Sequence, residues 1–207
     1  MNNKRSLKRS FATAVLCIVA AISLQGCVEM LIGTAVMGTF AASDRRTFGA
    51  QTEDKAIIFK GESSASKVAG DKGHVNVTSF NRKVLLTGEI RDQQMKMQVE
   101  REVARIEGVH SVVNELEIAG VSSFTSRSSD ALITSKVVAS FVDAKDIFSN
   151  SFKVVTERGI VYLMGRVTHR EGNRAAEIAS GVSGVQKVVK VFDYISEGEL
   201  QQLSNTR

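Results

Sequence analysis

Cys27 is the residue of this chain whose setting most clearly predicts chemistry. It follows a Leu-Gln-Gly tripeptide at the end of an apolar run that starts at Phe11, and a basic stretch precedes that run. A small residue before a cysteine in this setting is typical of a bacterial lipoprotein signal peptide. We therefore expect residues 1–26 to be removed. The Cys27 thiol would then carry diacylglycerol through a thioether, and the freed amine would carry an N-acyl chain.

The predicted anchor also indicates a location. The apolar run is too short to span a bilayer as a stable helix, whereas several acyl chains together give stable anchoring. Val28 follows the cysteine at the position where inner-membrane lipoproteins of proteobacteria usually have aspartate. We therefore expect an anchor in the outer membrane, on its periplasmic face. No cofactor is expected beyond the acyl chains on Cys27.

The charge balance gives no indication of nucleic-acid binding. The chain has 27 basic and 22 acidic residues, but four of the bases and none of the acids lie in residues 1–26. The remaining chain is therefore close to neutral, and no basic surface of the kind that attracts nucleic acid is predicted. The only other cysteine, Cys17, lies in the same leader. No disulfide is expected, although the periplasm would permit one.

The candidate catalytic residues are few and poorly spaced. His74, His110 and His169 are the only histidines, and none has another histidine or a cysteine at metal-ligand spacing. We expect polar surface roles for them. Glu100 and Glu102 are the most obvious carboxylate pair, but residues two apart on a helix point in different directions. The sequence therefore predicts no metal site and no enzyme.

The part of the chain after the leader contains one pattern twice. Residues 75–90 match residues 152–167 at an offset of 77, and residues 108–114 match residues 184–190 at an offset of 76. Two copies form a tandem pair, because solenoids generally need three or more repeats.

Each copy is predicted to run helix, strand, strand, helix, strand. The pairs at 81–82 and 158–159 link two alternating apolar runs as tight hairpins. The third strands, at 112–118 and 188–195, return after a helix and can therefore pair parallel with the strand before it. The fold class is α+β, with two helices on a three-stranded mixed sheet in each copy. Such small units have little core of their own, so we expect the two copies to pack together.

The helices show matching features in the two copies. The second helix of each carries an apolar face at helical spacing, followed by a glycine that we expect to end it. These residues are Val99, Val103, Ile106 and Gly108 in the first copy and Ala175, Ile178, Val182 and Gly184 in the second. In the opening helices Asp54 aligns with Asp130. The first opening helix also contains Gly61, which costs about 1 kcal/mol relative to alanine, so Gly61→Ala is expected to stabilise it.

The order of these motifs resembles the BON domain. Two such units behind a lipidated cysteine, with a glycine-rich start at 33–39 and then Asp44, Arg45 and Arg46, resemble the dual-BON outer-membrane lipoproteins of Gram-negative bacteria. The resemblance covers nearly all of the chain after the leader. It implies binding of anionic phospholipid through the first helix of the second domain, and a role in envelope integrity.

The resulting domain boundaries follow the composition. Ser128 or Ser129 is expected to cap the opening helix of the second domain. The predicted segments are a signal peptide at 1–26, a lipidated N-terminal linker at 27–50, a first BON domain at 51–119, a Ser-rich linker at 120–128, a second BON domain at 129–196 and a C-terminal tail at 197–207.

The opening helix of the second domain has more apolar residues than one core stripe needs. The stripe is Ile133, Val137 and Phe141, and the additional apolar residues are Leu132, Val138 and Val142. The helix is either buried on two sides, against the first domain, or exposes an apolar edge that enters the membrane interface while Lys136 meets phosphate. In the family that the chain resembles, close relatives carry tryptophan at the position of Leu132, and this departure bears on the strength of insertion. The lipid-binding residues predicted are Leu132, Ile133, Lys136 and Val138.

The charge distribution favours the membrane interpretation mildly. Residues 119–195 carry ten basic and seven acidic side chains, against ten and eleven in residues 51–118. The alternative function is a periplasmic protein-binding scaffold for outer-membrane assembly or cell-wall remodelling machinery, because exposed sheet edges can accept a partner strand. The expected partners are anionic membrane lipids and possible envelope proteins, not nucleic acid, and the protein is expected to be a monomer.

Overall fold

The computed structural model describes residues 44–205. The predicted signal peptide, Cys27 and most of the predicted N-terminal linker therefore lie outside the described residues. The described part contains two units with the same order of elements, as the internal repeat predicts, and the α+β fold class is confirmed.

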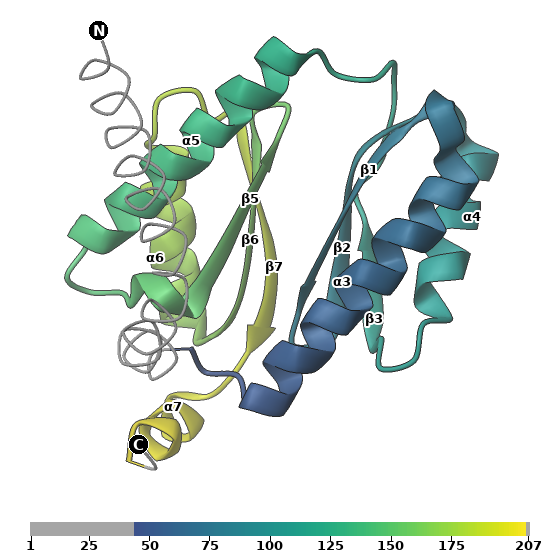
Figure 1. Ribbon diagram of the computed structural model, residues 1–207. Coiled ribbons are helices and arrows are strands. Elements are labelled where there is room, and N and C mark those ends of the chain that lie inside the picture. Colours follow the sequence, from purple (N-terminus) through teal and green to yellow (C-terminus); the bar gives the residue numbers. More distant parts are fainter. Residues whose placement is uncertain (1–43, 206–207) are drawn as a thin grey trace, which may run out of the picture. The chain divides into compact units, whose positions relative to one another are not determined.

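The first unit has two helices on one face of a mixed sheet (Figure 1). Strand β1 pairs antiparallel with β2, which pairs parallel with β3 and β4. The predicted third strand is thus present in two short pieces. The elements are α3 (Phe48–Ala69), the short η1 (Gly70–Lys72), β1 (His74–Phe80), β2 (Lys83–Ile90), α4 (Gln93–Ala104), β3 (Ser111–Asn114) and β4 (Glu117–Ile118).

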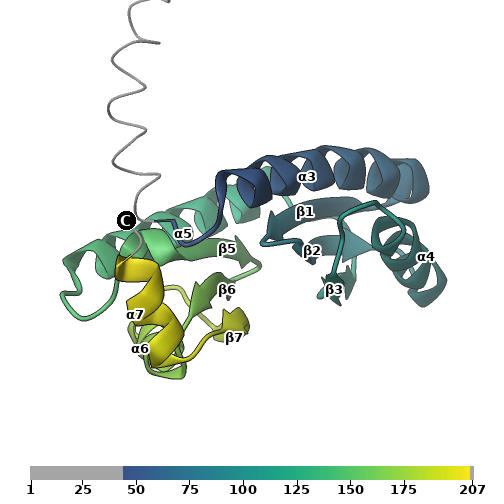
Figure 2. The same ribbon diagram turned by 90° about the horizontal axis from the view of Figure 1, so that it is seen from below.

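The second unit repeats this arrangement with an unbroken third strand. Strand β5 pairs antiparallel with β6, and β6 pairs parallel with β7. The predicted C-terminal tail contains the helix α7, which follows β7 (Figure 2). The ion pair of Arg170 and Glu197 links α7 to the start of α6. The elements are α5 (Phe124–Asp143), η2 (Ser149–Ser151), β5 (Phe152–Glu157), β6 (Ile160–Val167), α6 (His169–Ser180), β7 (Lys187–Tyr194) and α7 (Glu197–Asn205).

The predicted tight hairpins are confirmed, and an aspartate of the opening helix holds each one. Asn81 and Arg82 have φ of 51° and 66°, and Arg158 has φ of 51°, as two-residue hairpin turns of type I′ require. Asp54 accepts hydrogen bonds from the backbone N–H groups of Asn81 and Arg82, both at 2.8 Å. Asp130 does the same in the second unit, for Arg158 and the glycine after it.

The strands divide their side chains between two kinds of core. Val84 and Leu86 pack beneath the helices of the first unit, and the residue between them, Leu85, points to the opposite face. Leu85 belongs to a cluster that includes Tyr162 and Met164 of the second sheet. The two sheets therefore pack against each other, and the expectation that the two copies share apolar contacts is confirmed.

The surroundings of Gly61 argue against the expectation that Gly61→Ala stabilises the helix. This glycine is buried in α3, and a Cβ added there would lie 2.8 Å from Cγ1 of Val77 in β1. Valine is rigid about χ1 and cannot move aside without strain. The glycine thus permits close packing of helix on strand, which outweighs its cost in helix propensity.

The glycines expected to end the second helices have another role. Helix α4 ends at Ala104 and α6 at Ser180, before Gly108 and Gly184 are reached. Both glycines lie in the following turn with positive φ, where an added Cβ would be 2.4 Å from Glu53 in one unit and 2.9 Å from Ile133 in the other. They allow this turn to pass close to the opening helix.

The predicted linkers are shorter than expected. Helix α5 begins at Phe124, inside the Ser-rich segment, and its N-cap is Ser123, whose Oγ accepts from the N–H of Ser126 at 3.2 Å. The predicted cap at Ser128 or Ser129 is therefore wrong. Serine-rich composition suggested a flexible linker, but serines also occur on exposed helix faces when tertiary packing stabilises the helix.

The end of the predicted N-terminal linker is also ordered. Arg45 is buried, and its guanidinium forms two hydrogen bonds with Glu171 at the start of α6, at 2.7 and 2.8 Å. Arg46 pairs with Asp44 and Asp54 and lies 4.2 Å above the Phe80 ring. The Asp-Arg-Arg motif thus joins the segment before α3 to both units.

Candidate lipid-binding surface

Helix α5 exposes a row of large apolar side chains. Phe124 and Val142 are 79% and 66% exposed, and they lie on one line because about five helical turns separate them. Val138 lies one turn before Val142, and Leu132, which is 64% exposed, lies to one side of this line. Phe148 is exposed in the loop that follows the helix. We refer to these five residues as the α5 apolar face.

The structure separates the predicted lipid-binding residues into two groups. Leu132, Lys136 and Val138 are exposed on α5. Ile133 is only 7% exposed and packs in the core of the second unit, so its inclusion was wrong. A residue needed for the core cannot enter a membrane without unfolding the helix from its sheet.

Sequence reasoning missed two residues of the face. Phe124 lies in the segment predicted to be a linker, and Phe148 lies beyond the helix. A large aromatic residue in an otherwise serine-rich stretch was the available signal for Phe124.

The alternative in which α5 is buried on two sides does not agree with the structure. Leu132, Val138 and Val142 are all exposed when the described residues of both units are considered together. The predicted core stripe is confirmed on the other side of the helix, where Val137 and Phe141 are buried. The apolar face is therefore a surface that the described residues leave uncovered.

The surroundings of the face are polar but contain few acids. Lys136 follows Leu132 by one turn and forms no ion pair with any described residue. The only exposed carboxylate of α5 is Asp143 at its last position. Small hydroxyl groups are exposed along the helix at Ser128, Ser129 and Ser135. Such a surface can bury apolar side chains while hydroxyl and ammonium groups meet anionic oxygens.

A rigid aromatic core supports α5 from below. The Phe141 ring lies 5.2 Å from the ring of Phe152, which lies 5.9 Å from that of Phe192. The Thr134 hydroxyl also donates a hydrogen bond to the hydroxyl of Thr156 at 2.7 Å. These contacts fix α5 on the sheet, so its outer face is presented without rearrangement.

One pocket beside the start of α5 does not coincide with this face. Its volume is about 640 Å³, and it lies between the segment before α5 and the β5–β6 turn. None of the five residues of the α5 apolar face lines it. Asp130, the carboxylate of its α5 wall, already holds the hairpin turn.

Most of the candidate catalytic residues have structural or surface roles. His110 is exposed, and His169 stacks on the Tyr194 ring with centroids 3.9 Å apart. Glu100 accepts from Asn114, whereas Glu102 pairs with Arg105, so the two carboxylates do not converge. The surroundings of His74 are different and are described below.

No helix within residues 44–205 combines the length and the hydropathy that crossing a bilayer requires.

Comparison with known proteins identifies both units. The model of the BON domain matches residues 62–120 and 129–196. The outer membrane lipoprotein DolP of Haemophilus influenzae is 40% identical over 179 residues, which cover 85% of this chain and 92% of that protein. The 21 kDa hemolysin of Actinobacillus pleuropneumoniae is 30% identical over 154 residues, which cover 73% of this chain and 79% of that protein. The osmotically-inducible protein Y of Escherichia coli is 29% identical over 55% of this chain and 58% of its own length.

Among solved structures, CdsD of the Chlamydia trachomatis type III secretion system aligns with 69% of this chain and 96% of its own. The identity is 12% and the TM-score is 0.29.

Proposed function

This chain belongs to the family of outer-membrane lipoproteins that carry two BON domains, and from that membership we propose that it binds anionic phospholipid through α5 and helps to maintain the cell envelope. The second BON domain would lie against the membrane in which Cys27 is anchored. The protein is a binding module and not an enzyme.

The observation that carries this proposal is the α5 apolar face. Exposing a large apolar side chain to water forgoes roughly 1.5–3 kcal/mol of burial. Four such side chains are exposed on one helix, with a fifth just after it. The burial free energy that they forgo is large for a domain of this size. Contact with the acyl region of a membrane would recover it.

The electrostatics favour an anionic surface. Lys136 lies beside Leu132 on the helix, and Lys145 follows the helix end, both exposed. Each base near an anionic membrane surface contributes about 1 kcal/mol. The acyl anchor would also confine the domain close to the membrane, so a weak intrinsic affinity is sufficient.

Vesicle flotation of the chain from residue 27 with Cys27→Ala tests the proposal, because this form has no acyl anchor. We expect vesicles that contain phosphatidylglycerol to retain it and purely zwitterionic vesicles not to. Leu132→Glu should lower retention by roughly tenfold or more, because it removes apolar contact and places a carboxylate against anionic headgroups. Its melting temperature should not change, since Leu132 is exposed.

The matched control is Phe59→Glu. Phe59 is an exposed apolar residue of α3, the corresponding helix of the first domain. Its replacement should leave retention unchanged. If the Cys27→Ala form without further substitution is not retained by anionic vesicles, the lipid-binding proposal is wrong and the protein-binding scaffold becomes the favoured function.

A further inference from the structure

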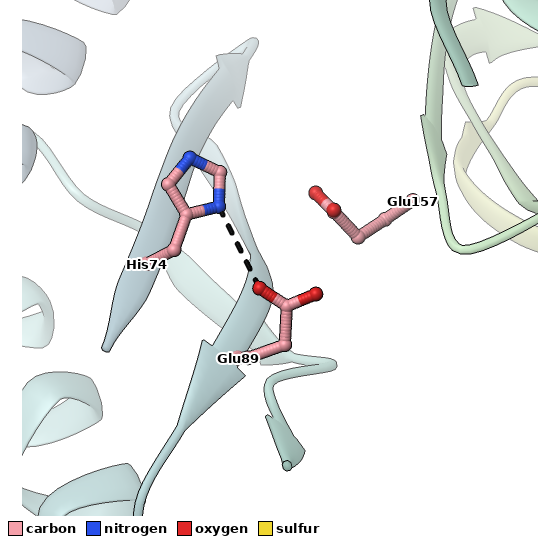
Figure 3. A group of neighbouring side chains, drawn as sticks. All are labelled: His74, Glu89 and Glu157. Atoms are coloured by element: carbon pink, nitrogen blue, oxygen red, sulfur yellow. Dashed lines mark ion pairs between the residues drawn. The ribbon is translucent and has the colours of Figure 1, made fainter. Parts of the chain in front are cut away.

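A cluster of polar side chains lies where the first sheet meets the β5–β6 turn of the second domain. His74 in β1 and Glu89 in β2 are direct cross-strand partners. They lie on the same sheet face as Leu85, which contacts the second sheet, because side chains alternate along a strand. Glu157, the last residue of β5, reaches the same place. Figure 3 shows the three side chains converging, and one ligand atom of each lies within 4.8 Å of the other two.

The atoms of His74 and Glu89 that face one another lack hydrogen-bond partners. Glu89 is fully buried, and Ser122 donates to its Oε1. No described residue forms a hydrogen bond with Oε2 of Glu89 or Nδ1 of His74. These two atoms are 3.7 Å apart, which is too long for a hydrogen bond. Leaving a buried carboxylate oxygen without a partner is unfavourable, and a cation placed between these atoms would remove that cost.

The nearby cation does not supply that charge. Arg158 lies 3.9 Å from the other oxygen of Glu89, and its closer ion pair, at 2.9 Å, is with Glu117. Glu157 accepts one hydrogen bond from Asn76, at 2.8 Å. Two carboxylates thus share a buried site with an excess of negative charge.

We propose that His74, Glu89 and Glu157 bind one divalent transition metal ion, of the class of Zn²⁺. Imidazole nitrogen and carboxylate oxygens are ligands that zinc takes at about 2.0–2.2 Å. Mg²⁺ and Ca²⁺ prefer oxygen ligands only, whereas the imidazole nitrogen of His74 suits a transition metal ion. The three ligand atoms all lie within 4.8 Å of one another, and they would have to move closer together around the ion. His74 is partly exposed, which gives the ion a route to the site.

The site would belong to the pair of domains and not to either one. His74 and Glu89 come from the first domain and Glu157 from the second. The repeat cannot form a second copy, because Ser151 and Arg166 occupy the positions of His74 and Glu89. Sequence spacing predicted no metal site for the same reason, since the ligands come from three strands that only the fold brings together. A bound ion would fasten the two domains to each other.

The test is Zn²⁺ binding by the full-length protein, purified in detergent and stripped with a chelator. Isothermal titration should give one Zn²⁺ per chain, and Zn²⁺ should raise the melting temperature, because an ion that binds only the folded state stabilises it. Loss of a residue that only supports a metal ligand typically lowers metal affinity by roughly 10- to 100-fold. Loss of a ligand should cost more, so His74→Gln and Glu157→Gln should each weaken Zn²⁺ binding by more than roughly 100-fold. Mg²⁺ and Ca²⁺ should have no effect on melting.

His110→Gln is the matched control, since His110 is exposed and glutamine occupies its position in the second copy as Gln186. This variant should bind Zn²⁺ like the unmodified protein. Two results would overturn the proposal. One is the absence of Zn²⁺ binding by the unmodified protein, and the other is equal binding by it and by His74→Gln, provided that circular dichroism shows both to be folded.

Discussion

Gly61 of α3 packs against Val77, and this contact sets the effect of a substitution there. Alanine would gain about 1 kcal/mol in helix propensity, but an added methyl group in a well-packed core costs about 1–3 kcal/mol. Because the Cβ would lie 2.8 Å from a rigid valine, we expect Gly61→Ala to lower the free energy of unfolding by on the order of 1 kcal/mol. Urea denaturation measures this.

The same helix supplies a control. Gly49 is exposed near the start of α3, and an added Cβ there would meet nothing closer than 3.9 Å. Gly49→Ala should therefore leave stability unchanged or raise it. If both substitutions raise it equally, the packing explanation for Gly61 is wrong.

Glu171 gives the protein a predictable sensitivity to acid. Burial raises the pKa of this carboxyl, but the hydrogen bonds from Arg45 and from the Thr168 backbone outweigh burial, so the pKa lies below the ordinary 4.5. At pH values between the folded and the unfolded pKa of Glu171, the unfolded state therefore binds more protons than the folded state. The contribution to stability is present above the unfolded pKa and is lost as the pH falls through the folded one.

Glu171→Gln should remove this contribution to the pH dependence of stability. The free energy of unfolding at neutral pH should fall by about 3 kcal/mol, because Arg45 stays buried without its charge partner. Denaturation curves from about pH 3 to 7 should then be flatter for the variant than for the unmodified protein. Curves of equal slope would contradict this account of Glu171.

Individual residues were predictable where local pattern decides their position. Leu132 and Val138 were identified because they lie off the core stripe of their helix, and both are exposed. Ile133 was predicted both to pack in the core and to contact the membrane. A side chain buried in the core of a fixed helix cannot also contact the membrane. His74 and Glu157 could not be associated from the sequence, since strand pairing and contact between domains bring them together.

At the scale of elements, an aspartate of the opening helix holds each hairpin. Asp130→Ala would leave the buried N–H groups of Arg158 and Gly159 without acceptors. We expect the free energy of unfolding to fall by on the order of 2 kcal/mol, as measured by urea denaturation. Asp143→Ala is the control, because Asp143 is an exposed residue at the end of the same helix. Equal stability of the two variants would show that the hairpin does not depend on Asp130.

The elements themselves followed from hydrophobic period and turn chemistry. Hairpin positions were predicted correctly, because two-residue turns with positive φ have strong sequence signals. The start of α5 was placed too late, since Ser123 and the serines after it have the composition of a linker. The ends of α4 and α6 were placed too late as well, because Gly108 and Gly184 serve the turn that follows each helix.

At the scale of the whole molecule, the two sheets pack against each other, and the helices lie on the outer face of each sheet. Leu85 of the first sheet and Tyr162 of the second share one apolar cluster. One face of each sheet is thus covered by its helices and the other by the partner sheet. The small size of each repeat predicted this shared core, but not the polar cluster at His74 that accompanies it. The proposed membrane contact would therefore be made by helices or loops, and α5 exposes more large apolar side chains than any other described helix.

Local polarity around α5 during vesicle binding tests the central claim most directly. In the chain from residue 27 with Cys27→Ala there is no other cysteine, so Val142→Cys or Phe59→Cys can carry one environment-sensitive fluorophore. With vesicles that contain phosphatidylglycerol, the label at 142 should shift to the blue and be quenched by spin-labelled acyl chains, whereas the label at 59 should not change. An unchanged label at 142, or equal quenching at both positions, would contradict membrane binding through α5.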